Sequence, residues 1–230
     1  MKEIAPGVKN IENRFPQVSQ ETAIHLSFDV LEENIRDCSD LRCKLLVNKT
    51  RLPFITSDSP MVKYNQYLEQ REWLGNWTGY PIIGLQIFLP ISPCMILLLY
   101  DNWTYTIGSK KSKKEHFVEI SDIEEIEQLN LLQVINCELV VFFNEHIKEN
   151  YIRELFRRSK KYNKANESLV QIMKGVSIKG RAKENTGDII SLSTSNSSIQ
   201  LNIAEFRLTK KAKKQIFDNK LIQIRSTLKR

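Results

Sequence analysis

The order of apolar and polar residues predicts one helix followed by a series of strands in the first half of the chain. Apolar side chains recur at helical spacing from Ala23 to Cys38 behind Ser19, a suitable N-cap, and they predict a helix over residues 20–38. Short apolar runs bounded by turn residues then predict strands. Their ranges are 43–48, 53–56, 60–64, 85–89, 95–101 and 103–107.

The second half alternates helical and extended patterns. Ser121-Asp-Ile-Glu124 has an N-cap and a glutamate three residues later, and the apolar residues behind it predict a helix to about Cys137. We expect a strand at 138–143, directly after this helix. Further along, the pattern predicts a long helix at 147–173, short β structure at 188–192, a strand at 199–203 and a partly helical tail from 209.

Together these elements predict an α/β or α+β fold in which a central mixed sheet is flanked by helices. A basic, mainly helical C-terminal extension follows the sheet. We divide the chain into an irregular lead-in (1–18), a core (19–145) and the extension (146–230), with a flexible Gly-, Ser-, Thr- and Asn-rich segment near 177–198.

Composition supports a globular protein with an uneven distribution of charge. The chain is 41% hydrophobic and carries a net charge of +7. Residues 148–230 hold 20 Lys+Arg against 7 Asp+Glu, which gives +13, whereas residues 1–147 hold 14 against 20, which gives −6. No apolar run approaches the about 20 residues that span a bilayer, and no signal-peptide core follows Met1. We therefore expect a cytoplasmic protein without a membrane partner.

Cysteine and histidine usage argues against a structural metal site. The four cysteines form no Cys-x-x-Cys pair, and the three histidines are scattered. We expect reduced thiols and no metal held by these residues.

The stretch Phe54-Ile-Thr-Ser-Asp-Ser-Pro-Met-Val62 stands out because it combines an apolar strand with a polar turn. Ser and Asp before proline favour a turn, since their side chains bond nearby backbone amides and proline restricts the residue before it. Asp58 is thereby held at a strand end. Either it caps the turn, or it projects into a cleft as a ligand or acid–base group.

This stretch, with Leu45-Leu-Val-Asn48 before it and Leu89-Pro-Ile-Ser-Pro93 after it, resembles the core of the bacterial domain-of-unknown-function family four-two-three-eight. The family pattern is Ser-Asp-Asn-Pro-Val followed by Pro-Leu-Ser-Pro, so Ser59 and Ile91 are mild departures. A later Asn-x-x-Gln helix also matches. The positions that the resemblance singles out are Ser57, Asp58, Pro60, Pro90, Ser92, Pro93, Asn130 and Gln133.

The resemblance extends over about residues 20–145. The His-x-x-Pro-x-x-Tyr-Leu segment with which family members usually begin is not found. This implies either a truncated relative or half of a split protein, whose partner supplies the segment. Asn130 and Gln133, three apart on one helical face, either orient a site or tie the helix to the sheet.

Candidate catalytic residues are few, because the common phosphate-loop, dinucleotide, serine-hydrolase and zinc-protease motifs are absent from the sequence. A metal-dependent nuclease needs clustered carboxylates. Asp58 and Asp101, each at a strand end, and Glu69 are the candidates. A divalent metal is expected as a cofactor only if the chain is nuclease-like.

Two surfaces suggest binding partners. The residues Arg153, Arg157, Lys160, Lys161 and Lys164 recur at helical spacing and form either a phosphate-binding groove or a solvated helix face. Residues 64–81 are rich in Tyr and Trp, and form either a lid packed on the sheet or a partner-binding loop.

Two functional hypotheses follow. The first is a bacterial-type intracellular protein that associates with nucleic acid and is nuclease-like or defence-related. The alternative is a non-catalytic protein-interaction module that uses the aromatic loop 64–81, with the partner supplying the missing N-terminal segment.

Overall fold

The computed structural model describes residues 20–71, 77–108, 116–163, 168–177, 186–194, 199–215 and 224–225. The chain forms two compact units, Met1–Ser39 and Asp40–Arg230. The first unit contains the helix α1 (Gln20–Cys38), which has the predicted bounds. Its predicted N-cap, Ser19, lies outside the described residues.

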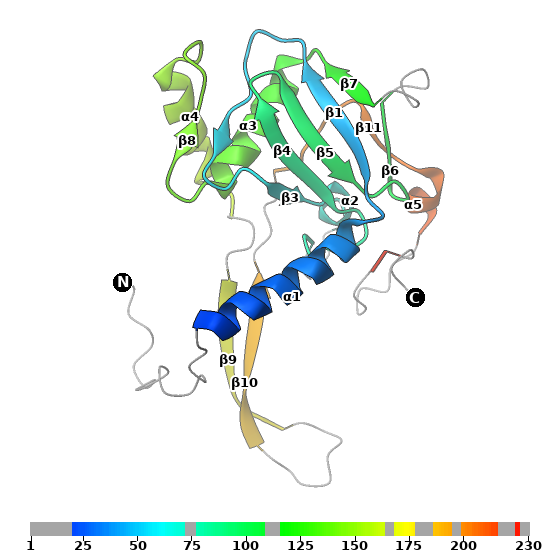
Figure 1. The fold of residues 1–230 in the computed structure, drawn as a ribbon, viewed down its shortest axis with the longest axis vertical. Coiled ribbons are helices and arrows are strands. Elements are labelled where there is room, and N and C mark those ends of the chain that lie inside the picture. Colours follow the sequence, from blue (N-terminus) through cyan, green and yellow to red (C-terminus); the bar gives the residue numbers. More distant parts are fainter. Residues whose placement is uncertain are drawn as a thin grey trace. The chain divides into compact units, whose positions relative to one another are not determined.

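The second unit is built on a mixed five-stranded sheet (Figure 1). The strand order is β3 (Val62–Tyr64), β4 (Gln86–Ser92), β5 (Met95–Tyr100), β1 (Arg42–Asn48) and β7 (Phe117–Ile120). Neighbours are antiparallel except for β1 and β7, which are parallel. The predicted central mixed sheet is therefore confirmed, and β7 is a strand that the sequence pattern did not predict.

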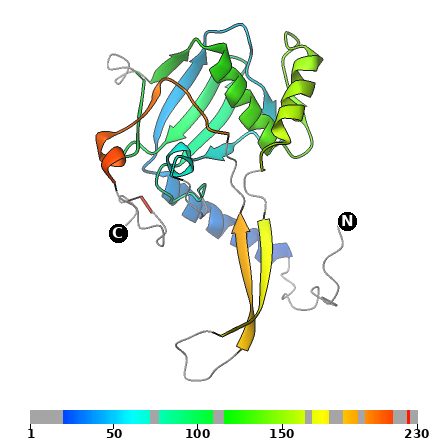
Figure 2. The ribbon, with the colours of Figure 1, turned by 180° about the vertical axis from the view of Figure 1, so that it is seen from behind.

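The helix α3 (Ile123–Asn136) lies across one face of this sheet (Figure 2). Its N-cap is Asp122, one residue after the predicted Ser121, and the Asp122 side chain accepts from the backbone N–H of Glu124. Ile126, Leu129 and Leu132 pack with buried sheet residues in the main core. Burial of this apolar face accounts for the position of the helix.

A second, smaller core joins α3 to the helix α4 (Glu149–Ser159). Ile152 and Leu155 of α4 are buried against Leu131, Val134 and Ile135 of α3. Ile55, in the segment that leads into β2 (Thr56–Ser57), belongs to the same cluster. The strand β2 pairs in antiparallel fashion with β8 (Val141–Phe142).

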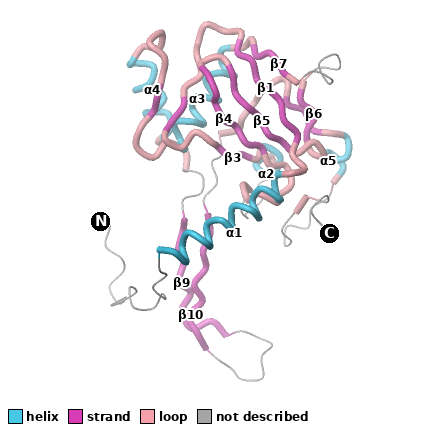
Figure 3. The backbone as a smooth tube through the Cα atoms, viewed as in Figure 1, coloured by secondary structure: helices cyan, strands magenta, loops and turns pink. Residues whose placement is uncertain are grey.

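The predicted mainly helical extension over 146–230 is wrong for the described residues (Figure 3). Helix α4 ends at Ser159, and residues 168–173, which were predicted to continue it, belong to β9 (Ser168–Ser177). The strand β9 pairs with β10 (Thr186–Thr194). β10 contains the short β structure predicted at 188–192 and occupies part of the segment predicted to be flexible. The helical prediction failed because Val170 and Ile172 are β-branched and alternate with other residues, a pattern that suits a strand.

Residues 201–212 also belong to the core rather than to a separate extension. β11 (Phe206–Leu208) pairs with β6 (Tyr105–Ile107), and α5 (Lys210–Lys214) follows it. Leu201, Ile203, Phe206 and Ala212 are buried in the main core. The predicted boundary at residue 145 therefore does not divide the second unit.

The predicted strand at 199–203 is absent, because side chains rather than a neighbouring strand satisfy its backbone. The N–H groups of Gln200, Leu201, Asn202 and Ala204 donate, respectively, to Glu69, the Tyr64 hydroxyl, Gln128 and Glu125. Burial raises the pKa of Glu125, and the hydrogen bond from Ala204 opposes that shift. None of the helices in the described ranges is long and apolar enough to cross a membrane.

Candidate binding groove

Asn130, on α3, binds the chain segment that leads into β2. Its Oδ1 accepts from the backbone N–H of Ile55 at 3.0 Å, and its Nδ2 donates to the Pro53 carbonyl at 3.0 Å and to the Tyr151 hydroxyl at 3.2 Å. Burial raises the pKa of Tyr151 to about 12, although the Asn130 hydrogen bond lowers it. One amide thus joins three segments of the chain.

Gln133 makes the equivalent connection one helical turn later. Its Nε2 donates to the Pro60 carbonyl at 2.9 Å, and its Oε1 accepts from the Ser57 hydroxyl at 3.3 Å. Ser57 Oγ also accepts from the backbone N–H of Ser59 at 3.2 Å, so Ser57, and not Asp58, caps the turn before Pro60. The Asn-x-x-Gln pair therefore ties this motif to the helix, although the bound segment lies outside the five-stranded sheet to which a tie was predicted.

The carboxylate of Asp58 holds a segment about 80 residues away in sequence. It accepts from the consecutive backbone N–H groups of Glu138, Leu139 and Val140 at 2.9, 2.7 and 3.1 Å, and the Asp58 N–H donates to the Val140 carbonyl at 3.0 Å. Desolvation raises the pKa of Asp58, but these donors outweigh it and hold the pKa below the usual 3.8. Asp58 thus fixes the loop that follows α3.

This geometry predicts a pH-dependent effect of Asp58→Asn. Because the folded-state pKa lies below the unfolded-state pKa, the stabilisation is complete above the unfolded value and is lost as pH falls through the folded value. In thermal melts, wild type should therefore exceed Asp58→Asn in Tm at neutral pH, and the difference should shrink towards pH 2, well below the usual 3.8. A difference that is equal at both pH values would contradict this role.

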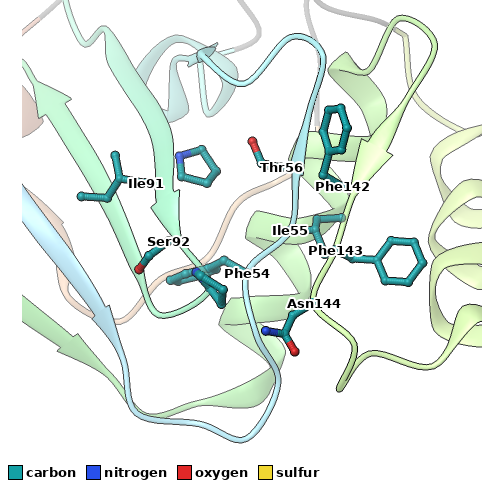
Figure 4. A pocket seen from close by; sticks show the side chains of 10 residues that line it. Phe54, Ile55, Thr56, Ile91, Ser92, Phe142, Phe143 and Asn144 are labelled. Carbon is teal, nitrogen blue, oxygen red and sulfur yellow. The ribbon is translucent and has the colours of Figure 1, made fainter.

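An open groove lies beside this motif, between the end of β4 with the first residue of its turn to β5 and the β2–β8 pair (Figure 4). Its volume is about 270 Å³. The Phe54 N–H donates to the Pro93 carbonyl at 2.8 Å and joins its two walls. The residues that line the groove are Phe54, Ile55, Thr56, Pro90, Ile91, Ser92, Pro93, Phe142, Phe143 and Asn144.

The structure therefore brings the family-motif positions together at one place. Pro90, Ser92 and Pro93 line one wall of the groove. Asn130 and Gln133 fix the opposite wall by binding the backbone of 53–60. The motif builds and supports the groove.

The segment 139–143, which we call the apolar lip, continues one wall of this groove. Leu139 is 87% exposed, and Val140, Phe142 and Phe143 are 47%, 56% and 44% exposed, whereas Val141 packs on the smaller core. Asp58 and β2 fix the backbone of the lip. Exposed apolar patches on a fixed backbone are typical of interaction sites.

The exposure of the lip was not predicted from the sequence, because a continuous apolar run is typical of a buried strand. Leu139-Val-Val-Phe-Phe143 was expected to be a strand, and only Val141–Phe142 forms one. The length of the run could have indicated this exposure. A strand that is covered on one face buries only every second residue, so a run of five apolar residues leaves some of them exposed.

The chemistry of the groove suits binding. Its lining offers aromatic and proline surfaces, together with the hydroxyls of Thr56 and Ser92 and the amide of Asn144. None of the ten lining residues carries an acidic, basic or thiol side chain. The groove is therefore suited to apolar contact and peptide hydrogen bonding.

The three predicted catalytic carboxylates are engaged in separate backbone networks. Glu69 is buried and accepts from the Tyr64 hydroxyl and the Gln200 N–H. Asp101 is buried and accepts from the N–H groups of Trp103 and Gly84 and from the Thr104 hydroxyl. Among the described residues, no group of three or more His, Cys, Asp or Glu side chains is placed to hold a metal ion. Asp58, Glu69 and Asp101 therefore do not form one metal-binding cluster.

The aromatic loop 64–81 has the arrangement of a packed lid in its described part. Tyr64, Tyr67 and Trp77 are buried, and the Lys63 ammonium lies 4.4 Å from the centre of the half-buried Tyr80 ring. Burial, together with the charge of Glu69, raises the pKa of Tyr64. Trp73, another aromatic residue of this loop, lies outside the described residues.

Carboxylates partly neutralise the predicted cationic stripe on α4. Arg153 pairs with Glu149 at 2.5 Å and Arg157 with Glu154 at 2.6 Å, both in exposed positions. Lys160 and Lys161 are exposed, and Lys164 lies outside the described residues. Nucleic-acid binding by this stripe stays a prediction.

The fold and the motif positions define an α/β protein with an apolar groove beside its sequence motif. The chain belongs to the family described as "Protein of unknown function (DUF4238)", whose model matches residues 1–146. This confirms the family indicated by the Ser-Asp-x-Pro and Pro-x-Ser-Pro motifs. No curated protein and no solved structure matches the chain.

Proposed function

We propose that this protein is an interaction module whose groove and apolar lip bind an extended segment of a partner protein. The observation that carries the proposal is the exposure of four large apolar side chains within the five residues of the lip. Their backbone is held by Asp58 and by pairing with β2, so the side chains are presented without a large ordering cost. Binding would remove this apolar surface from water.

The shape of the groove suggests how the partner is recognised. A volume of about 270 Å³ suits one large apolar anchor side chain flanked by backbone. Phe142 and Phe143 supply aromatic contact, and Thr56 and Asn144 supply hydrogen-bonding groups for a peptide chain. The expected ligand is therefore an extended segment with one buried aromatic or aliphatic anchor.

This surface differs from the aromatic loop 64–81 considered from the sequence. Tyr64 and Tyr67 are 1% and 0% exposed, and the Tyr64 hydroxyl is bonded to Glu69 and Leu201. Those rings stabilise the core. The groove offers the accessible apolar area that such an interface requires.

Selection from a displayed library of random peptides tests the proposal. The wild-type chain serves as bait, and the double variant Phe142→Ser/Phe143→Ser serves for counter-selection. Phe117→Ser is the matched control, because Phe117 is 42% exposed on β7, at the sheet edge away from β3 and β4. We expect peptides with a shared apolar anchor that bind wild type and Phe117→Ser. Peptides that bind the double variant equally well, or the absence of any enriched sequence, would refute the groove as the site.

Single substitution of Phe142 should separate binding from stability. Because its side chain is 56% exposed, Phe142→Ser should change the free energy of unfolding by less than about 0.5 kcal/mol. As a central aromatic contact, its loss should weaken peptide binding by about 2 kcal/mol, which is roughly 30-fold. Urea denaturation and calorimetric titration measure the two effects. A large loss of stability with unchanged affinity would show that Phe142 stabilises the fold and does not contact the peptide.

A further inference from the structure

A second surface of this protein is strongly cationic. Within residues 207–214, five positive side chains and no negative ones occur in the sequence. We call these five residues the lysine platform: Arg207 on β11 and Lys210, Lys211, Lys213 and Lys214 on α5. All five are exposed.

The platform stands on a fixed piece of backbone. Ala212, the central residue of α5, is fully buried, and its carbonyl accepts from the Tyr67 hydroxyl at 3.1 Å and from Arg71 Nη2 at 3.0 Å. Thr209 caps the helix by accepting from the Ala212 N–H, and its hydroxyl donates to the Trp103 carbonyl at 2.8 Å. The lysines therefore project from a short helix that the core holds in place.

The charge of the platform is not compensated within the described part of the chain. No ion pair there joins any of the five cations to a carboxylate. The arginines of α4 contrast with them, since Arg153 and Arg157 each pair with a glutamate of their own helix. Lysines three and four residues apart repel one another on a helix. A bound polyanion would relieve this repulsion.

We propose that the lysine platform binds the phosphate backbone of nucleic acid. Lysine ammonium groups are compact charges on flexible stems, and they contact phosphates without reading bases. Binding is therefore independent of sequence and falls with salt through the release of counterions. The +13 balance of residues 148–230 adds long-range attraction for a polyanion.

This site goes beyond the proposed groove function, because it uses a different surface. Figures 1 and 2 show α5 and β11 at one side of the second unit, and α4 and β8 at the other. A peptide in the groove and a nucleic acid on the platform therefore engage separate parts of the same compact unit. One chain would bring a partner protein to nucleic acid.

Fluorescence anisotropy of a short, labelled, single-stranded oligonucleotide tests the proposal over a salt series. The variant K210Q/K211Q/K213Q/K214Q removes four charges. Since each phosphate contact on a single strand contributes about 0.7 to the slope of log K against log salt, the slope should fall by about 3, with at least about tenfold weaker binding at low salt. The charge-preserving Lys→Arg variant at the same four positions should keep the wild-type slope.

The matched control R153Q/R157Q/K160Q/K161Q neutralises four cations on and after α4. It should change the slope by no more than about 0.7, which is the contribution of one phosphate contact. The paired variants K210Q/K214Q and K211Q/K213Q should each lose about half the effect, which separates charge loss from misfolding. An unchanged slope in the quadruple α5 variant, or a larger loss in the α4 variant, would overturn the proposal. The proposal would also be overturned if polyglutamate displaced the labelled oligonucleotide as well as an unlabelled oligonucleotide of equal charge does. That result would assign the platform to an acidic protein.

Discussion

Replacing Arg225 with alanine should lower the free energy of unfolding by about 3–5 kcal/mol, the range for breaking a buried ion pair. The Arg225 side chain is 2% exposed, and its Nε contacts the two carboxylate oxygens of Asp40 at 3.0 and 2.9 Å. Its Nη1 donates to the carbonyls of Tyr80 and Ile82 at 2.6 and 3.1 Å. Alanine would leave both carbonyls and the Asp40 carboxylate without this guanidinium.

Urea denaturation measures this effect, and two variants define its origin. Arg225→Lys keeps the charge but lacks the planar fork that reaches Asp40 and two carbonyls together, so it should recover only part of the loss. A double-mutant cycle with Asp40→Ala isolates the ion pair, because both residues share it directly. A loss below about 1 kcal/mol in Arg225→Ala would show that the residue does not join the cooperative core.

Asn130→Ala should cost about 3 kcal/mol, the second largest effect expected. Asn130 is 1% exposed, and its amide is the hydrogen-bond partner of the Ile55 N–H and the Pro53 carbonyl. Each buried backbone group left without a partner costs about 1–3 kcal/mol. Because Ile55 lines the groove, the same substitution should also weaken peptide binding.

Two further variants sharpen this prediction. Asn130→Asp retains an acceptor for Ile55 but places a carboxylate oxygen against the Pro53 carbonyl, so at neutral pH it should recover none of the stability lost in alanine. Asn102→Ala is the matched surface control, since Asn102 is exposed, and it should change stability by less than about 0.5 kcal/mol. Equal stability of Asn130→Ala and Asn102→Ala in urea denaturation would disprove the tethering role.

The sheet and the first helix were predictable because their signals are local. The helix Gln20–Cys38 and the strands β1 and β5 follow apolar patterns that can be read within a short window. The Asn130–Gln133 pair was recognised through the motif, although its partners in 53–60 were not. Local patterns therefore predicted the fold class, and the motif identified Asn130 and Gln133, which hold one wall of the groove.

The remaining features depend on contacts between distant residues. Asp58 bonds to Leu139, and Arg225 pairs with Asp40, 81 and 185 residues apart. The extended segment that includes Leu201 takes its hydrogen bonds from side chains, which no periodicity reveals. The exposure of Phe142 likewise depends on which face of β8 the smaller core covers.

Photo-crosslinking tests the central claim, that the groove binds a partner segment, most directly. A photoreactive phenylalanine analogue replaces Phe142 in one sample and Phe117 in the other, and each is irradiated with a peptide obtained by the selection. We expect crosslinks at position 142, which lines the groove, and none at position 117 on β7. Equal crosslinking at the two positions, or crosslinking at 117 alone, would contradict the assignment of the groove.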